Sequence, residues 1–341
     1  MHLEVITMRI NRGVKSVEEN RLYGYLRKNT LTQFIRNNMG ILIGLFVLSV
    51  ILTIFTETFL NSKNLLTVLR QICTNSLLAF GMTFVLIIGE IDLTVGSVVG
   101  ASGVAVVMLI ESGVPLVLAF LIALLLGALV GLINGLIIAF IGMPSFIVTL
   151  SMMGTIRGVA YYITDGRSVA CTNSVFNSIG NGYILGVPIP IYVVALVMII
   201  ISVILYRTKF GRRMYAVGGN VTAAKYTGIR IKSMKIKVYM ISSTLAALAG
   251  IMLASRMYSG QPTAGQNYEA DAIAAAVLGG TSFTGGIGTI GGTLIGALVI
   301  GILSNGLNLL HISSYIQMVI KGIVIILAVA FDFLKNRKGN V

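Results

Sequence analysis

Long apolar runs separated by short polar stretches occupy most of this chain. Ten of them come close to the roughly 20 residues that a helix needs to cross the hydrocarbon core of a bilayer. The eighth is short and rich in Gly and Ala. The pattern predicts an all-α polytopic membrane protein with about ten transmembrane helices. The expected spans lie near residues 41–57, 71–90, 95–111, 115–140, 145–163, 187–206, 236–257, 271–287, 290–310 and 312–334.

Composition excludes a soluble globular protein. Of the 341 residues, 56% are hydrophobic and only 11% are charged. A soluble domain carries about 25% charged residues because its surface must be hydrated. A chain with so few charges needs lipid as its main solvent.

The net charge is +14, which in a soluble protein would suggest a nucleic-acid partner. Here the 25 Lys and Arg residues cluster between spans: seven in segment 1–38, nine in segment 207–237 and three in the tail after residue 334. An even number of expected spans separates these segments, so they share one side of the membrane. By the positive-inside rule that side is the cytoplasm. We therefore expect both termini to be cytoplasmic and expect no nucleic acid to bind.

Small residues recur every fourth position in two of the expected spans. Such stripes let helix backbones approach closely, and van der Waals contact then drives helix association within lipid. We expect both stripes to be packing faces. They consist of Ala123, Gly127, Gly131 and Gly135 in one span, and of Gly288, Gly292 and Gly296 in the other.

The segment 207–237 contains no acidic residue beside its nine basic ones. This segment is too short to form a domain and longer than most connections between helices. We therefore expect it to form a binding surface. Residues 222–226 should form a short helix after a turn at 218–220, and Gly228 is available as its C-terminal cap. Charge alone leaves two alternatives, a partner protein or anionic lipid headgroups.

Two carboxylates, Glu90 and Asp92, interrupt the apolar sequence between the second and third expected spans. An ionised Asp at the bilayer centre costs about 3 kcal/mol, so Asp92 should face protein or water. One interpretation is a tight turn in which Asp92 caps the following helix. The other is a proton- or sodium-coupled site.

A second interruption begins at the outer polar segment 261–271 and continues into the glycine cluster of segment 279–288. Glycines at membrane depth indicate a broken helix. Irregular backbone is tolerated there only where protein buries it or where it lines a cavity. This region is therefore a candidate for the transport pathway.

We expect no catalytic residue, metal site or cofactor. Cys73 and Cys171 lie far apart without metal-ligand spacing, and no Lys follows a Gly, as a phosphate-binding P-loop requires. ATP, if used, must be hydrolysed by another chain. The polar, basic start does not look like a cleaved signal peptide, and residues 20–36 form either a helix on the membrane surface or a frayed tail.

Four segments together resemble the permease subunit of ATP-binding cassette (ABC) sugar importers of the ribose type. They are GEIDLTVGS, GGNVTAAKYTGI, SGQPTAGQNYEADAIAAAVLGGTSFTGGIGT and KGIVIILAVAFD, and the resemblance extends from about residue 40 to residue 335. The third is closer to the ribose branch than to the galactose branch. The first departs from the family pattern at Glu90, where Gly is usual, and at Thr94, where Ser is usual.

The resemblance implies a type II ABC importer-like permease in the bacterial inner membrane. Its segments would be a cytoplasmic basic N-terminal segment (1–38), a transmembrane permease domain (39–335) with a cytoplasmic coupling loop (207–237), and a cytoplasmic tail (336–341). The implied partners are a cytoplasmic ATPase, a substrate-binding protein that delivers a monosaccharide, a second copy of the permease, and membrane lipid. In the family, the matching loop forms the coupling helix on the ATPase. Its residues here are Gly219, Asn220, Ala223, Ala224, Lys225 and Gly228.

Two further groups of residues are candidates for function. Asp92, Asn134, Tyr161 and Phe283 are candidates for the translocation path. Arg167 and Arg256 are candidates for docking the binding protein, since Arg forms bidentate pairs with carboxylates; ordinary surface arginines are the alternative.

Two rival classes remain open on the residues alone. In an ion-coupled secondary transporter, Glu90 and Asp92 would carry the coupling ion, and the basic loop (residues 207–237) would bind only lipid. A passive channel is the second rival. Uptake that survives collapse of the ion gradients but stops on ATP depletion separates the importer from both.

Overall fold

The computed structural model describes residues 38–338. The expectations for segment 1–37, including a surface helix at 20–36, lie outside these residues. The chain divides into two compact units, Met1–Gly44 and Leu45–Val341. The first unit contributes only the start of the helix Asn38–Phe55 to the described part. The remaining description concerns the second unit.

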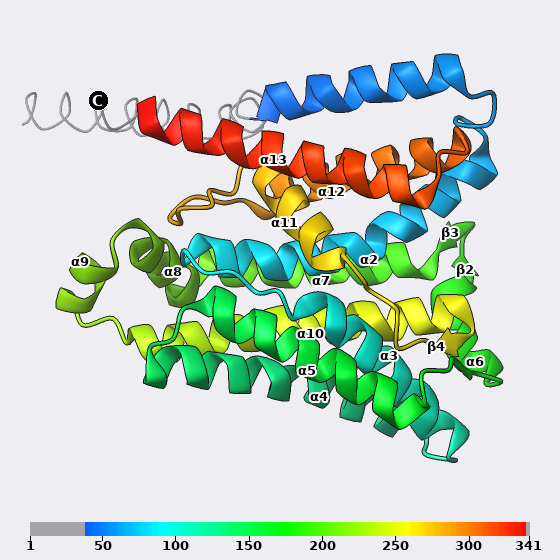
Figure 1. Cartoon of the computed structure of the whole chain (residues 1–341), viewed down its shortest axis with the longest axis horizontal. Coiled ribbons are helices and arrows are strands. Elements are labelled where there is room, and N and C mark those ends of the chain that lie inside the picture. Colours follow the sequence, from blue (N-terminus) through cyan, green and yellow to red (C-terminus); the bar gives the residue numbers. More distant parts are fainter. Residues whose placement is uncertain (1–37, 339–341) are drawn as a thin grey trace, which may run out of the picture. The chain divides into compact units, whose positions relative to one another are not determined.

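Helices make up most of the second unit (Figure 1). Within the described residues, seven helices are long and apolar enough to cross a membrane. The chain is therefore a polytopic helical protein, as predicted. These helices are Asn38–Phe55, α2 (Ser62–Ile87), α4 (Leu116–Leu136) with the π-helical turn η1 (Ile137–Ile141), α5 (Ser145–Thr164), α7 (Ile189–Arg207), α10 (Ile231–Met257) and α12 (Ile290–Leu309).

Three further helices lie at expected spans, and their apolar parts are shorter than those of the seven. The helix α3 (Val95–Glu111) has the expected bounds and 17 residues, and the apolar part of α13 (Ser314–Lys338) ends at Ala330. The expectation of one continuous helix over 271–287 is wrong, because α11 (Tyr268–Leu278) has only 11 residues, whereas the broken helix expected at the glycines of 279–288 is confirmed. Positive φ angles follow it at Gly280, Gly285 and Gly286. Glycine adopts that conformation without steric cost, so the segment 279–289 leaves the helix.

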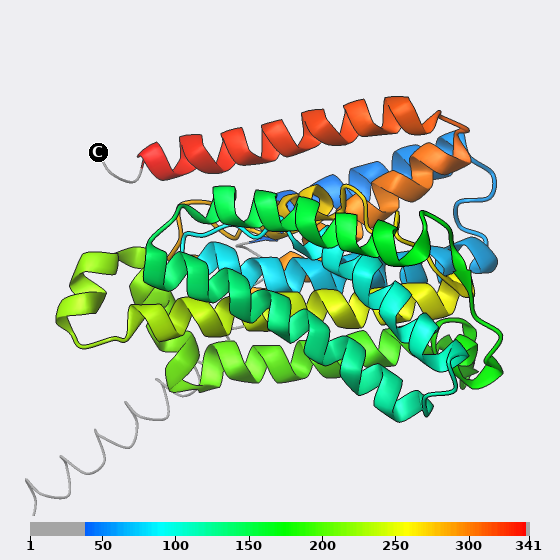
Figure 2. The same cartoon turned by 60° about the horizontal axis from the view of Figure 1, so that its bottom comes forward.

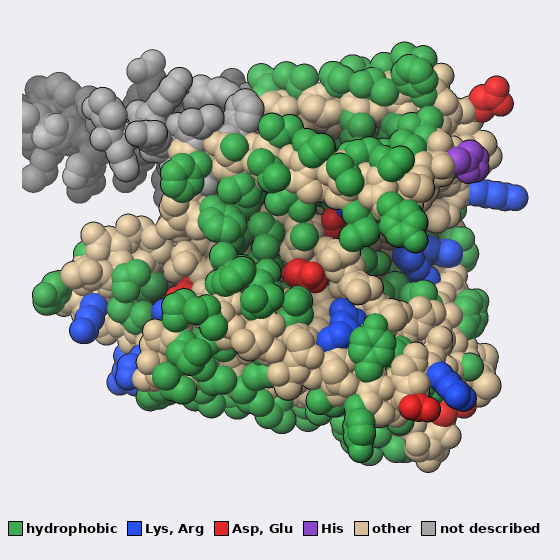
Figure 3. Space-filling view, viewed as in Figure 1, with side chains coloured by type: hydrophobic (Ala, Val, Ile, Leu, Met, Phe, Trp, Pro, Cys, Tyr) green, Lys and Arg blue, Asp and Glu red, His purple; other side chains and the backbone are tan. Residues whose placement is uncertain are grey.

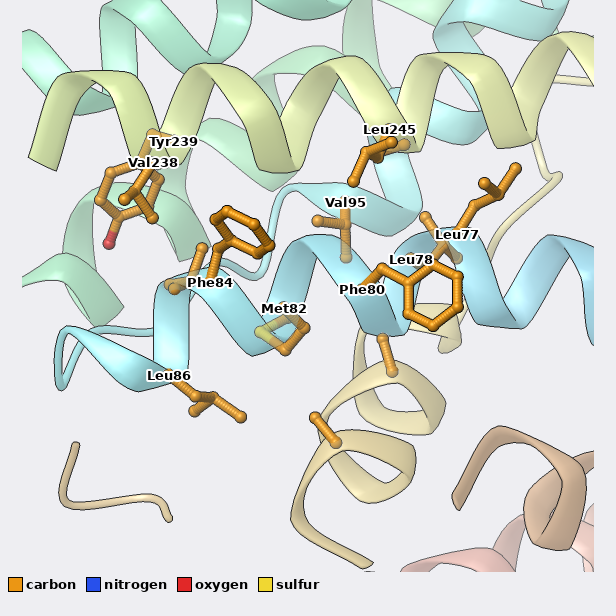
Figure 4. Packing of buried hydrophobic residues seen from close by; sticks show 14 of the residues in the cluster. Leu77, Leu78, Phe80, Met82, Phe84, Leu86, Val95, Val238, Tyr239 and Leu245 are labelled. Carbon is orange, nitrogen blue, oxygen red and sulfur yellow. The ribbon is translucent and has the colours of Figure 1, made fainter. Parts of the chain in front are cut away.

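The long helix α10 lies at the centre of the bundle, packed against α2, α3 and α4. Figure 4 shows Val238 and Tyr239 of α10 beside Phe84 of α2. These side chains are fully buried, as are most residues of α2 from Cys73 to Ile87.

The glycine stripe of α4 is a packing face, as predicted, but the second stripe is corrected: Gly292 and Gly296 lie in α12, whereas Gly288 precedes that helix. A Cβ on Gly131 would lie 2.7 Å from the Cα of Met240, and one on Gly135 would lie 2.6 Å from the Cα of Ile236. These distances are too short for a side chain, so α4 and α10 touch backbone to backbone. In the second stripe, a Cβ on Gly296 would meet the carbonyl of Ala275 in α11.

Two short strand pairs were not foreseen by the all-α prediction. Antiparallel pairing joins β1 (Val169–Ala170) to β4 (Ser259–Gly260) and β2 (Tyr183–Ile184) to β3 (Val187–Pro188). Each strand has two residues, too few for a period of two to show in the sequence. The short helix α6 (Ser174–Asn181) lies near them, at one end of the bundle (Figures 1 and 2).

The basic loop lies at the opposite end and is largely helical (Figure 1). It contains α8 (Lys209–Gly219) and α9 (Val221–Tyr226), so the expected short helix is confirmed. The expected turn at 218–220 is corrected, because Gly218 and Gly219 complete α8. The chain changes direction at Asn220 alone, whose side chain accepts a hydrogen bond from the Ala223 N–H at 2.9 Å and so caps α9.

Candidate functional site

Two non-helical segments meet inside the bundle, one before α3 and one after α11. The Gly286 N–H donates to the carbonyl of Ile87, the last residue of α2, at 2.9 Å. A Cβ on Gly285 would lie 3.1 Å from the Gly89 nitrogen. The last turn of α8 joins them, since a Cβ on Gly218 would lie 2.5 Å from the Gly286 nitrogen. The basic loop thus rests directly on both interruptions.

Asp92 lies fully buried in the first of these segments. Its Oδ1 accepts hydrogen bonds from the Thr94 N–H at 3.0 Å and the Thr94 hydroxyl at 2.5 Å, and its Oδ2 accepts from the Ser242 hydroxyl at 2.9 Å. The amide of Asn134 donates to the Thr94 hydroxyl at 3.1 Å. The structure therefore brings Asp92 and Asn134 into one buried network. Asp92 closes a turn on Thr94, the residue before α3, rather than bonding to an N–H within the helix.

Three successive residues of this segment contact one face of α10. Glu90 forms an ion pair with Lys235, the carbonyl of Ile91 accepts from the Tyr239 hydroxyl at 3.0 Å, and Asp92 bonds to Ser242. The three positions on α10 are four and three residues apart, which places them on one side of a helix. Glu90, which replaces the Gly usual in the family, is thus paired with Lys235, one of the nine basic residues of segment 207–237.

Arg157 of α5 holds a second irregular segment in place. Its guanidinium donates to the carbonyls of Pro262 and Ala264, at 2.5 and 2.6 Å, and to the carbonyl of Gly96 in α3, at 3.0 Å. A Cβ on Gly96 would collide with the Glu269 carboxylate. Both Arg157 and Glu269 lie against α3, at Gly100 and Gly96, but form no direct ion pair with each other among the described residues. The charged side chains of Arg157 and Glu269 and the backbone carbonyls that accept from Arg157 therefore lie together between α3, α5 and α11.

A further ion pair joins α11 to α13. The Lys321 Nζ lies 2.8 Å from the Asp271 Oδ2, and Asp271 is buried. Sequence reasoning overlooked both Arg157 and Lys321, because it counted charges between the expected spans. Their position inside those spans was the available signal, since a charge within a span must find a partner or serve the pathway.

The other expected path residues lie closer to the surface. Tyr161 is half-buried and follows Arg157 by one helical turn on the same face of α5. Phe283 is half-buried in the segment after α11 and packs against the main core. Tyr161 therefore belongs beside the Arg157 cluster, whereas Asp92 and Asn134 form a separate, fully buried network.

The expected coupling residues fall on α9 and its two ends. Ala223 and Lys225 are exposed, whereas Ala224 is buried at 3% exposure. Gly228 has φ +80°, the left-handed conformation expected of a residue that ends a helix. Ala223 and Lys225 are therefore open to a partner, and Ala224 holds α9 in place.

The two expected docking arginines lie at the opposite end and differ in exposure. Arg167 is exposed in the turn that follows α5. Arg256 is half-buried in the last turn of α10, where its backbone carbonyl accepts a weak bond from the Asn181 amide at 3.3 Å. Only Arg167 presents its side chain freely on the surface.

Comparisons with known proteins agree with this architecture. A family model described as a branched-chain amino acid transport system permease component matches residues 64–329. The chain belongs to this permease family. It is a multi-pass membrane protein, and its relatives are transport permease subunits. No solved structure matches the permease.

Several curated relatives of the permease are named as sugar permeases. It is 49% identical to a ribose import permease protein of Bacillus subtilis (strain 168) over 304 residues, which cover 89% of this chain and 94% of the relative. It is 44% identical to the ribose import permease protein of Escherichia coli (strain K12) over 299 residues, 86% and 93% of the two chains. It is 38% identical to the L-arabinose transport system permease protein of the same organism over 298 residues, 87% and 91% of the two chains.

Proposed function

We propose that this permease is the transmembrane subunit of an ABC importer that takes up ribose or a similar monosaccharide. The observation that carries the proposal is the graded identity to curated relatives: 49% and 44% to ribose permeases against 38% to an arabinose permease. The family description names amino acids, but these relatives match nearly the full chain. The sugar is therefore the better-supported substrate class.

The permease crosses the membrane ten times in this proposal, with both termini in the cytoplasm. The seven long helices account for seven crossings, and α13 for another. Each of the remaining two crossings combines a shorter helix with an irregular segment: 88–94 with α3, which has 17 residues, and α11, which has 11 residues, with 279–289. Broken helices of this kind are typical of substrate pathways in transporters.

The helix α9 is the surface for the cytoplasmic ATPase. It lies at the end of the bundle with the basic loop, and Ala223 and Lys225 are exposed on it (Figure 1). Because α8 ends against both irregular segments, a push on α9 reaches the interior of the bundle through the backbone of Gly218. ATP-driven closure of the ATPases would in this way rearrange the pathway.

The pathway lies along the face formed by α3, α5, α11 and α13. Figure 3 shows this face as mostly hydrophobic, with basic and acidic side chains both near its middle and at its edges. Arg157, Tyr161 and Glu269 supply polar groups that suit sugar hydroxyls, and Phe283 lies further along. A second copy of the permease would cover this face in a homodimer. The buried Asp92 and Asn134 shape the path by holding the start of α3.

The binding protein docks at the end that carries the strands, opposite α9. Arg167 is the exposed charge there for an acidic partner surface. Arg256 is half-buried and lies beside α6, where its backbone carbonyl accepts from the Asn181 amide.

The test is uptake by reconstituted vesicles that contain the permease, the ATPase and the binding protein. Ribose uptake should persist when proton and sodium gradients are collapsed and should stop when ATP is withheld. Uptake that follows an ion gradient without ATP would instead establish a secondary transporter, and uptake that needs neither would establish a channel.

A variant in α9 tests the coupling surface in the same vesicles. Ala223→Asp places a charge on the exposed side of α9, so ATPase co-purification should fall by at least ten-fold while the permease keeps its melting temperature. Ala224→Asp is the structural comparison, because it buries a charge and should lower that temperature itself. Full ATPase co-purification with Ala223→Asp would contradict the proposed surface.

A further inference from the structure

A hollow lined by basic residues lies between α8, the loop after α9 and the first turns of α10. Its volume is about 460 Å³, within the range of small-molecule sites. Three exposed cationic side chains line it together with a hydroxyl and four other residues. The lining consists of Arg213, Arg230, Lys237, Ser233, Phe210, Gly228, Ile229 and Met234.

No acidic side chain among residues 38–338 forms an ion pair with the basic residues of this hollow. Among the described residues, the ion pairs are those of Lys235 and Lys321, so Arg213, Arg230 and Lys237 have no acidic partner. The segment 207–237 contains no Asp or Glu that might approach. Three cations around one hollow repel one another unless an anion lies between them.

The backbone adds a further preference for an anion. The hollow contains the N-terminus of α10, whose first residue is Ile231. Arg230 precedes it without a side-chain cap, and the first backbone bond of the helix there is donated by Met234. The backbone N–H groups of residues 231–233 therefore have no partner within α10 and point out of its N-terminal end, where the hollow lies. Unbonded N–H groups and the helix dipole favour phosphate and similar groups.

The position of the hollow indicates where the anion comes from. It lies just beyond the last residue of α7, Arg207, and at the first residues of α10, so it is level with the ends of two spanning helices. That is the level of lipid headgroups. Phe210, Ile229 and Met234 add an apolar wall beside the charges. Basic pockets between spanning helices on the cytoplasmic side bind anionic headgroups in this way.

We propose that this hollow binds the phosphate headgroup of an anionic phospholipid, with Arg213, Arg230 and Lys237 around the phosphate. The basic loop then has two separate partners: α9 faces the ATPase, and the hollow on the other side of Gly228 holds a lipid. A phospholipid at this point would fix α8 to α10, and α8 rests on the irregular segments inside the bundle.

The experiment measures binding of phosphatidylglycerol, with phosphatidylcholine and inorganic phosphate as comparisons, to the full-length permease in detergent. Native mass spectrometry counts retained lipid, and the shift in melting temperature on titration gives the apparent affinity. The test variant replaces Arg213, Arg230 and Lys237 with Gln. The control replaces Arg207, Lys209 and Arg212 with Gln, which removes the same charge from the same loop outside the hollow.

The wild-type permease and the control should retain phosphatidylglycerol, and the test variant should bind it about 100-fold more weakly, since each basic residue near a membrane surface contributes about 1 kcal/mol. A second variant with Arg213→Lys, Arg230→Lys and Lys237→Arg keeps the charge and should restore binding. All six positions are exposed, so the fold is retained in each variant.

Three outcomes would overturn the proposal. Equal weakening in the control would mean that the loop attracts lipid by charge alone. Equal protection by inorganic phosphate at the same concentration would mean that the hollow takes free phosphate rather than lipid. Retention of lipid together with loss of ATPase co-purification in the test variant would make the hollow part of the protein partner's surface.

Discussion

Arg157 shows how one side chain can organise three separate segments. It reaches from α5 to two carbonyls of the loop before α11 and to one carbonyl of α3. A planar guanidinium donates in several fixed directions, which the ammonium of Lys does not reproduce. The loop carbonyls would otherwise be left without donors inside the bundle.

Replacing Arg157 tests this role. Arg157→Gln should lower the free energy of unfolding by about 3 kcal/mol, because hydrogen bonds to charged groups contribute about 1.5 to 3 kcal/mol each and truncation leaves acceptors unpaired. Arg157→Lys should fall between Gln and wild type. Thermal unfolding in detergent and proteolysis within 261–267 give the readouts. Arg167→Gln is the control for stability, and a melting temperature lowered equally there would contradict the prediction.

The buried network at Asp92 makes a second prediction at this scale. Asp92→Asn turns one acceptor into a donor and faces it toward other donors, so stability should fall by about 2 to 3 kcal/mol. In a double-mutant cycle, Asp92→Asn and Ser242→Ala should show a coupling energy of about 1 kcal/mol or more, because the two side chains are bonded. Asp92→Asn combined with Ser112→Ala, an exposed position at the end of α3, should be additive. Additivity in both cycles would contradict the network.

At the scale of elements, the glycine stripe of α4 determines how closely α4 and α10 pack. A Cβ on Gly131 would enter the backbone of α10 at Tyr239 and Met240. Gly154 in α5 has open space around it. The two positions form a matched pair within spanning helices.

Gly131→Ala should therefore lower the melting temperature by several degrees, since overpacking of a close contact costs about 1 to 3 kcal/mol. Gly154→Ala should leave it unchanged or raise it slightly, because Ala is the better helix former. Differential scanning fluorimetry of the two purified variants measures this. Equal melting temperatures would mean that α4 can move away from α10 at no cost.

The sequence predicts the elements that have a long apolar run or a regular stripe. Seven long helices, the glycine stripe of α4 and the short helix α9 follow from such patterns. The end of α11 at Leu278 agrees with the glycine cluster of 279–288, which indicated a broken helix, but the hydropathy over 271–287 does not show it, because alanines and glycines give a high hydropathy whether or not the backbone stays helical. The strands have two residues each, and the pairing of β1 with β4 also depends on a contact between residues some 90 positions apart, Val169 with Gly260.

The site is predictable only where its residues stand out locally. Asp92 interrupts apolar sequence and was found, but its partner Ser242 lies 150 residues away and looks like any other small polar residue. Arg157 could have been noticed because it is a charged residue inside an expected span, but a count of charges between the spans leaves it out. Grouping these residues into two clusters requires the fold.

At the scale of the whole permease, the last turn of α8 connects the cytoplasmic end to the interior. The Gly218 backbone lies against the Ile87 carbonyl and the Gly286 nitrogen, and any side chain there would separate them. The hydrogen bond between Gly286 and Ile87 would then be strained or lost.

Gly218→Val should accordingly abolish ATP-driven uptake while α9 still binds the ATPase. The expected readouts are at least ten-fold slower uptake in vesicles with unchanged co-purification. Gly219→Ala, in open space on the adjacent residue, is the control for stability and should keep the wild-type melting temperature. Normal uptake by Gly218→Val would show that the connection transmits nothing.

The triple contact between residues 90–92 and one face of α10 also limits how α10 can slide. The partners Lys235, Tyr239 and Ser242 occupy successive turns, so a small displacement along the axis breaks all three contacts together. The next position with equivalent spacing is a full turn away, about 5.4 Å. We therefore expect α10 to move past this loop by jumps between discrete registers. A continuous axial drift is disfavoured because it loses the three contacts without replacing them.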